Sequence, residues 1–216
     1  MRSGGWMKQG SSWYYLSGSG AMQTGWLSKG GSWYWLDPDS GAMATGWEKA
    51  SDGKWYYFEG SGAMRSGGWM KQGSSWYYLS GSGAMQTGWL SKGGSWYWLD
   101  PDSGAMATGW EKASDGKWYY FEGSGAMQSS RWLKQGTAWY YLSGSGAMQT
   151  GWLLTGGAWY WMDPESGMMA TGWLENGGSW YYLDPSSGAM ATGTAVIDGT
   201  RYIFDDSGAC ADFVDE

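Results

Sequence analysis

Aromatic and apolar residues gather in short runs along this chain, and Gly-rich segments separate the runs. In the segment GWLSKGGSWYWL, two such runs flank a short glycine-containing turn, a pattern typical of a β-hairpin. The related segment EKASDGKWYYF turns at Asp52-Gly53, a pair that suits the positive φ of tight hairpin turns. No stretch shows the period of an amphipathic helix. The pattern therefore predicts an all-β chain built of hairpins.

The hairpin pattern recurs nine times, with steps of 20, 21 and 22 residues from Trp6 to Trp26, Trp47 and Trp69 and similar steps thereafter. Each unit opens on a tryptophan: Trp6, Trp26, Trp47, Trp69, Trp89, Trp110, Trp132, Trp152 and Trp173. An aromatic triplet follows, and it begins at Trp13, Trp33, Trp55, Trp76, Trp96, Trp118, Trp139, Trp159 and Trp180. A connector with a G-x-M element closes each unit, and its methionines are Met22, Met43, Met64, Met85, Met106, Met127, Met148, Met169 and Met190.

A lone two-stranded hairpin is marginal in water, so the repeats are expected to stack into a solenoid of about ten hairpins. Residues 1–63 and 64–126 are identical, which indicates a recent duplication or an engineered array. Since this longer unit covers three short repeats, about three hairpins are expected per superhelical turn. The nine repeats occupy residues 1–193. Residues 194–216 are predicted to form a degenerate capping hairpin and an acidic tail, because Thr194, Arg201 and Cys210 replace the two tryptophans and the methionine.

The composition limits what can form the core and what the chain can do. The 216 residues include 40 Gly, 21 Trp and 16 Tyr, so rings, Met and Leu must supply the buried surface. The net charge is −7, and no basic patch of the kind that binds nucleic acid is present. With no histidine, Ser-His or Cys-His catalysis and a histidine zinc site are excluded, and we expect no enzyme activity and no cofactor. A calcium loop at residues 37–48 is disfavoured because it lacks a third acid.

The stacked aromatic residues suggest a binding site. Side chains alternate along a strand, so the first and third residues of a triplet share one face and the central one points the other way. That central residue is always tyrosine: Tyr14, Tyr34, Tyr56, Tyr77, Tyr97, Tyr119, Tyr140, Tyr160, Tyr181 and Tyr202. Two tryptophans of one hairpin, the tyrosine of the next and a connector methionine could thus form a cage for a quaternary ammonium ion. The alternative is that these rings only form the core.

The energy of such a cage is small. Three rings at about 0.5–2 kcal/mol each give about 2–5 kcal/mol, which corresponds to near-millimolar binding at best. Many cages that engage one polymer would gain strongly by avidity. The repeat number is therefore expected to be part of the function.

The segment TGWLSKGGSWYWLDPDSGAMATGW resembles the choline-binding repeat of Gram-positive surface proteins, and the resemblance covers residues 3–210. It implies a left-handed superhelix of hairpins, with choline held between consecutive repeats by two Trp and one Tyr. It also implies non-covalent attachment to choline on cell-wall teichoic acids. By position the cages would be Trp6, Trp13 and Tyr34; Trp26, Trp33 and Tyr56; Trp47, Trp55 and Tyr77; Trp69, Trp76 and Tyr97; Trp89, Trp96 and Tyr119; Trp110, Trp118 and Tyr140; Trp132, Trp139 and Tyr160; Trp152, Trp159 and Tyr181; and Trp173, Trp180 and Tyr202.

The expected partner is thus choline or phosphocholine on a cell-wall polymer, outside the cell. No signal peptide and no membrane span are found, so the chain is expected to be a fragment of a longer secreted protein. A homodimer through a terminal repeat is a further expectation. Two other functions stay open: a carbohydrate (glucan)-binding repeat module, and an engineered or purely structural solenoid.

Overall fold

The computed structural model describes residues 4–214, and within this range the chain is all-β, with no helix. None of these residues therefore forms a helix that could cross a membrane. The strands are β1 (Gly5–Gln9), β2 (Ser12–Leu16), β3 (Gly25–Lys29), β4 (Ser32–Leu36), β5 (Gly46–Lys49), β6 (Trp55–Phe58), β7 (Gly68–Gln72), β8 (Ser75–Leu79), β9 (Gly88–Lys92), β10 (Ser95–Leu99), β11 (Gly109–Lys112), β12 (Trp118–Phe121), β13 (Arg131–Gln135), β14 (Ala138–Leu142), β15 (Gly151–Thr155), β16 (Ala158–Met162), β17 (Gly172–Asn176), β18 (Ser179–Leu183), β19 (Gly193–Ile197), β20 (Thr200–Phe204) and β21 (Cys210–Val214).

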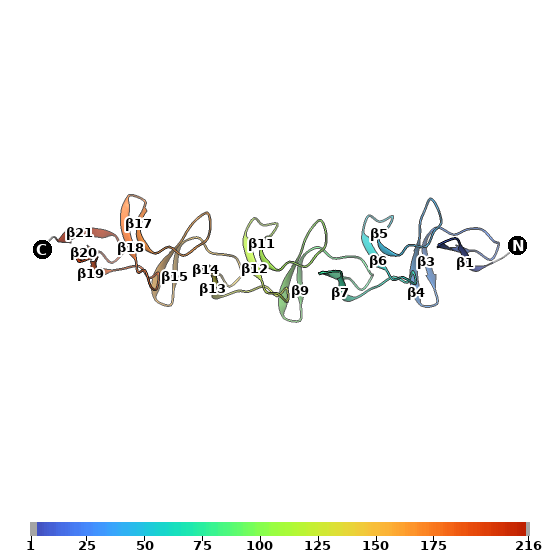
Figure 1. Ribbon diagram of the computed structural model, residues 1–216, viewed down its shortest axis with the longest axis horizontal. Helices are drawn as coiled ribbons and strands as arrows, with labels where there is room; N and C mark the ends of the chain where they lie inside the picture. The colour runs from blue at the N-terminus through green and yellow to red at the C-terminus, as the bar shows by residue number, and fades with distance from the viewer. Residues whose placement is uncertain (1–3, 215–216) are drawn as a thin grey trace. The chain divides into compact units, whose positions relative to one another are not determined.

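Consecutive strands pair as antiparallel hairpins, which confirms the predicted fold class (Figure 1). The chain divides into two compact units, and the boundary lies between Ala107 and Thr108. The first unit holds the five hairpins from β1 to β10. The second unit holds the hairpins from β11 to β20 and the additional strand β21.

The hairpin of β3 and β4 shows how the sequence sets the register. Its turn is Gly30-Gly31, and both residues have positive φ (61° and 79°), as a tight two-residue hairpin turn requires. The register then places Trp26 opposite Trp35 and Ser28 opposite Trp33. These four side chains share one face, because alternate residues of a strand point the same way. The other face carries the central tyrosine of the triplet.

Within each unit, backbone hydrogen bonds connect successive hairpins. The amide of Met43 donates to the carbonyl of Trp13 at 2.7 Å, and the amide of Met64 donates to the carbonyl of Trp33 at the same distance. The same bond recurs in the second unit, where the amide of Met169 donates to the carbonyl of Trp139 at 2.8 Å. The connectors therefore hold the stack together at the place where two hairpins meet.

One apolar position in each repeat forms the innermost core. The residue that follows each triplet is fully buried from the second repeat onward, and this position holds Leu36, Phe58, Leu79, Leu99, Phe121, Leu142, Met162, Leu183 and Phe204. It lies opposite the residue at the start of the hairpin, which is a glycine as in the pair Gly25 and Leu36, or Arg131 in the seventh repeat. The connector methionine then bridges to it, as Met43 does to Leu36. A buried apolar side chain and the connector methionine thus close the second to ninth repeats.

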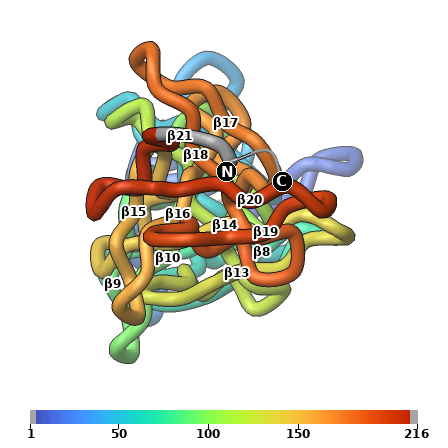
Figure 2. The backbone as a smooth tube through the Cα atoms, turned by 90° about the vertical axis from the view of Figure 1, so that its left-hand side faces the viewer, coloured from blue at the N-terminus to red at the C-terminus, as the bar shows by residue number. Residues whose placement is uncertain are grey.

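The last sheet has one strand more than the sequence pattern predicts. Cys210–Val214 pairs antiparallel with β20, so β19, β20 and β21 form a three-stranded sheet, which lies at the red end of the tube in Figure 2. Cys210 lies opposite Phe204, where the other repeats have the connector methionine. Most of the segment expected to be an acidic tail is therefore a strand, and residues 215–216 lie outside the described range.

Candidate functional site

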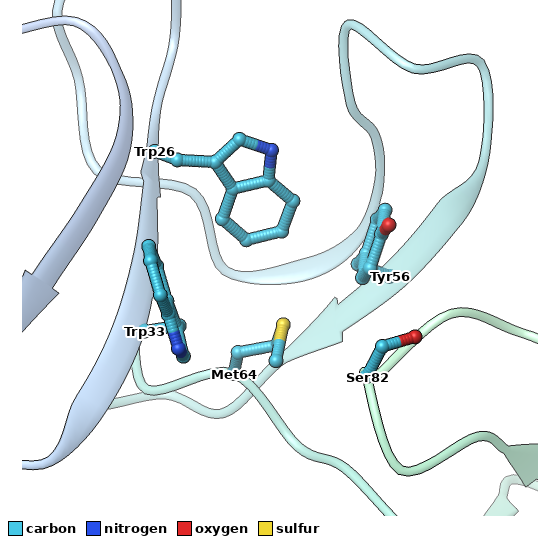
Figure 3. Close-up of a pocket in the computed structure, with 5 residues that line it drawn as sticks. All are labelled: Trp26, Trp33, Tyr56, Met64 and Ser82. Atoms are coloured by element: carbon cyan, nitrogen blue, oxygen red, sulfur yellow. The ribbon is translucent and has the colours of Figure 1, made fainter.

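A cavity of about 400 Å³ lies between consecutive hairpins of the first unit. Its walls are Trp26 of β3, Trp33 of β4 and Tyr56 of β6, as Figure 3 shows. Met64, in the connector after β6, directs its thioether into the space between the three rings. Ser82, in the connector after β8, completes the rim. The structure thus brings together the two tryptophans, the tyrosine and a methionine that the sequence places in one cage.

The three rings stand at steep angles to one another. The centroids of Trp26 and Tyr56 are 4.8 Å apart with an interplanar angle of 80°, and those of Trp26 and Trp33 are 6.1 Å apart with an angle of 88°. Rings at right angles can turn separate faces toward one enclosed point. Because an aromatic face carries partial negative charge, this arrangement suits a cation without hydrogen-bond donors.

The same arrangement recurs in both units. The centroid of the opening tryptophan lies 4.8–5.0 Å from that of the central tyrosine of the next hairpin in the pairs Trp6 and Tyr34, Trp47 and Tyr77, Trp69 and Tyr97, Trp110 and Tyr140, Trp132 and Tyr160, Trp152 and Tyr181, and Trp173 and Tyr202. Three further cavities of about 250–290 Å³ lie at Trp55, Trp118 and Trp139. The cage of Trp89, Trp96 and Tyr119 takes residues from both units and stays a prediction.

The burial of the rings in each triplet shows which of them belong to the core and which line a cage. The first tryptophan is exposed in all nine repeats, with 38–50% of its surface accessible. The third ring instead packs against the opening tryptophan of its own hairpin, and Trp35 retains only 2% exposure. Both alternatives left open by the sequence therefore occur within one triplet: its third ring is core, and its first ring is an exposed wall.

Each methionine belongs to the hairpin that supplies the tyrosine. Met64 and Tyr56 come from the third repeat, whereas Trp26 and Trp33 come from the second. The order is the same for Met85, Met148 and Met169 in the other three cavities. Met22 belongs to the first repeat, whose tyrosine closes no cage, and its side chain is exposed.

Polar rim residues of the cavities were not predicted from the sequence. They come from the connector two repeats further along the chain, and they are Ser82, Asp102, Ser103, Glu165, Ser166, Ser186 and Ser187. The glycine beside them packs on the floor methionine, since a Cβ added to Gly83 would lie 2.6 Å from Met64 Cε. The recurring glycine of the G-x-M element could have indicated this contact in the sequence, because only a residue without a side chain fits there. Among residues 4–214, no cluster of acidic, His or Cys side chains could hold a metal ion.

A carboxylate stands behind the central tyrosine of the third repeat, and the identical copy repeats this pair at Tyr119 and Asp115. The hydroxyl of Tyr56 donates to Asp52 Oδ2 at 2.8 Å. Burial, together with this hydrogen bond and the charge of Asp52, raises the pKa of Tyr56 to about 12. The backbone amide of Lys54 and the Tyr56 hydroxyl lower the pKa of Asp52. At neutral pH the tyrosine is therefore protonated and the carboxylate charged, and this negative charge favours a cation in the cavity.

This pair predicts a loss of stability in alkali. The pKa of Tyr56 in the folded chain exceeds the value of about 10 for an unfolded tyrosine, so its contribution is complete below about pH 10 and is lost as the pH rises toward 12. Denaturant unfolding at a series of alkaline pH values measures this loss. Burial is the largest cause of the raised pKa and persists in Asp52→Asn, but this variant removes the charge that adds to it, so we expect a smaller decline over the same range. An equal decline in both proteins would contradict the assignment.

Comparisons with known proteins agree with this geometry. The family model of choline-binding repeats matches residues 3–46, 66–109, 104–132, 133–171 and 165–194, and a model of cell wall binding repeats matches residues 45–64. None of the curated proteins matches the chain.

Three solved structures, all from Streptococcus pneumoniae, are similar to this one. Choline-binding protein F is 26% identical with a TM-score of 0.70, over 98% of this chain and 94% of that chain. The choline-binding domain of CbpL is 32% identical with a TM-score of 0.58, over 90% of this chain and all of that chain. The modular autolysin LytC is 29% identical with a TM-score of 0.64, over 98% of this chain but 47% of that chain.

Proposed function

Because this chain belongs to the family of choline-binding repeats, we propose that it is a binding module whose cages each hold the trimethylammonium group of a choline. The observation that carries the proposal is the exposed tryptophan at the start of every triplet. An exposed ring of this size is costly to leave in water unless a ligand covers it. Its regular recurrence beside a perpendicular ring favours a binding role over packing.

The cavity chemistry supports choline over a sugar. The lining of the cavity at Trp26 and Trp33 consists of three rings and a thioether, with one hydroxyl at the rim. A trimethylammonium group is apolar on its surface and cationic overall, so it needs ring faces and few hydrogen bonds. A sugar would require several polar partners at fixed positions. The negative charge of Asp52 behind Tyr56 further favours a cation.

The natural ligand is proposed to be a polymer outside the cell. The similarity of residues 45–64 to cell wall binding repeats supports attachment to a wall polymer that carries choline, such as teichoic acid. Each cage binds weakly, and several cages on one polymer chain add up by avidity. The module then acts by attachment, without chemistry of its own.

A choline titration followed by near-ultraviolet circular dichroism tests this proposal. Binding is expected to change the tryptophan and tyrosine spectrum at millimolar choline, whereas sodium chloride at the same ionic strength should not. No change up to about 100 mM choline, well above the affinity expected for such cages, would contradict the proposal. Retention on dextran in place of choline resin would support the carbohydrate alternative.

Replacement of Gly83 by alanine is expected to damage one cage. Gly83 has a φ of +88°, and its new Cβ would also meet the Met64 side chain. The strained φ alone should destabilise the protein by about 1–2 kcal/mol. The added Cβ must also displace the flexible methionine from the cavity floor, so we expect weaker choline binding there.

Gly94→Ala is the matched control, because Gly94 has a φ of +81° and no atom within 4 Å of the added Cβ. Chemical denaturation should show a loss of stability for both variants, and the loss in Gly83→Ala should be at least as large because of its added contacts. Choline titration should separate them, and equal affinity in the two variants would contradict a role for Met64 as the floor.

A further inference from the structure

The residue across the hairpin from the exposed tryptophan differs from repeat to repeat. In three hairpins it is a lysine whose ammonium stands over the ring: Lys8 Nζ lies 5.9 Å from the Trp13 centroid, Lys71 Nζ lies 5.9 Å from that of Trp76, and Lys134 Nζ lies 5.4 Å from that of Trp139. In the second hairpin the same position is Ser28, opposite Trp33. The first, fourth and seventh cages thus have a positive charge at one wall, whereas the second has none.

Lys134 lies on the cage side of its hairpin. It pairs with Trp139, and Trp132 pairs with Tyr141 two positions away, so Lys134, Trp139 and Trp132 share one face. Trp132 and Trp139 line the adjacent cavity of about 270 Å³ together with Tyr160, and the rim of this cavity is neutral, being formed by two serines. A cation bound in this cavity would therefore lie close to the lysine ammonium.

Over residues 4–214, the salt bridge found joins Arg65 and Glu59, so none of these three lysines is in an ion pair. Like charges repel, so an unbalanced ammonium weakens the binding of a ligand that is only a cation. A ligand that brings its own anion a few bonds from its cation would instead gain a partner.

We propose that Lys8, Lys71 and Lys134 each form a phosphate subsite beside a cage, so that these three cages prefer phosphocholine to choline. The inference rests on the proposed function. Two carbons and one ester oxygen separate the ammonium nitrogen of phosphocholine from its phosphorus. With the trimethylammonium group against Trp139, the phosphate can therefore reach the Lys134 ammonium, a compact charge suited to phosphate oxygens.

Other cages provide contrasting surroundings. At the cage of Trp26 and Trp33 the rim residue is Ser82 and the cross-strand residue is Ser28, so no lysine favours phosphocholine there. The carboxylate of Asp52 behind Tyr56 instead favours choline, which carries no negative charge. At the third cage Asp102 lines the rim and Lys49 pairs with Trp55, so the two charges offset each other. The preference for phosphocholine is thus expected where a lysine stands over the exposed ring and no acidic residue lies at the rim, as at Trp139.

The test uses the full chain with nitrogen-15 in its tryptophan indoles, titrated separately with choline and with phosphocholine. The Trp139 indole signal is assigned by its loss in Trp139→Phe. The Trp33 signal serves as the reference without a lysine, and overlap with Trp96 is harmless because both have serine as cross-strand partner. We expect phosphocholine to bind about threefold or more tighter than choline at Trp139, and no tighter than choline at Trp33.

Lys134→Gln is expected to remove the preference at Trp139 and leave Trp33 unchanged, and added salt should reduce the preference in the original protein. Equal affinities at Trp139, or a preference that survives Lys134→Gln, would overturn the inference. Tighter binding of both ligands in Lys134→Gln would also overturn it, because the lysine would then compete with the ligand for the ring. If neither ligand shifts either signal, the proposed function itself fails.

Discussion

Trp35→Ala is expected to lower the free energy of unfolding of its hairpins by about 3–5 kcal/mol, because it removes a large buried side chain and leaves a cavity. Trp33→Ala, two residues away in the same strand, is expected to cost less than about 1 kcal/mol and to abolish choline binding at its cage. The exposures of 2% for Trp35 and 48% for Trp33 are the reason for this contrast. Denaturant unfolding and choline titration of the two variants measure both effects.

The identical second copy supplies the control for this pair. Trp96 and Trp98 repeat the positions of Trp33 and Trp35, with exposures of 48% and 3%, so the corresponding alanine variants should behave alike. If Trp33→Ala destabilises the protein as much as Trp35→Ala does, the exposed ring is structural. The chain would then be better described as a solenoid that needs no ligand.

Deletion of residues 64–126 is expected to reduce retention on a choline-bearing polymer by at least about tenfold, because avidity grows steeply with the number of engaged sites. Residues 1–63 and 64–126 are identical, so the shortened chain keeps its native sequence on both sides of the junction. Three of the nine repeats are lost, while the cap and the last repeats are kept. Elution from choline resin at increasing free choline measures the change.

The affinity of each remaining cage for free choline should not change in the shortened chain. Equilibrium dialysis with monomeric choline provides this control, and it should show fewer binding sites with the same affinity per site. Unchanged retention on the polymer would show that one or two cages carry all of the binding. The repeat number would then have no role in attachment.

The cage rings could be predicted from the sequence because they follow from strand alternation. The period of two places Tyr34 on the opposite face from Trp33, and stacking then brings Tyr34 to Trp6 of the preceding hairpin. The structure places these rings together in each of the cages that lie within one unit. The handedness of the superhelix and the number of hairpins per turn stay predictions.

The burial of individual rings, the rim residues of the cages and the last strand could not be predicted, because they depend on how the hairpins pack in space. Trp33 and Trp35 share a face, and their different burial depends on which of them the next hairpin covers. Ser82 reaches the cage of Trp26 from two repeats away, which depends on the offset of the stack. Strand β21 has none of the aromatic signature of the repeats, so its pairing with β20 could not be read from periodicity.

Because three consecutive repeats line the cavity at Trp26, a choline in it would touch all three at once. Separation of any one of these hairpins must then also break its contacts with the ligand. A module attached to a wall polymer would be under tension whenever the cell surface is sheared. Each filled cage would then hold three consecutive hairpins together through their contacts with one ligand. The choline groups that we propose as the attachment points would therefore also strengthen the chain against mechanical unfolding.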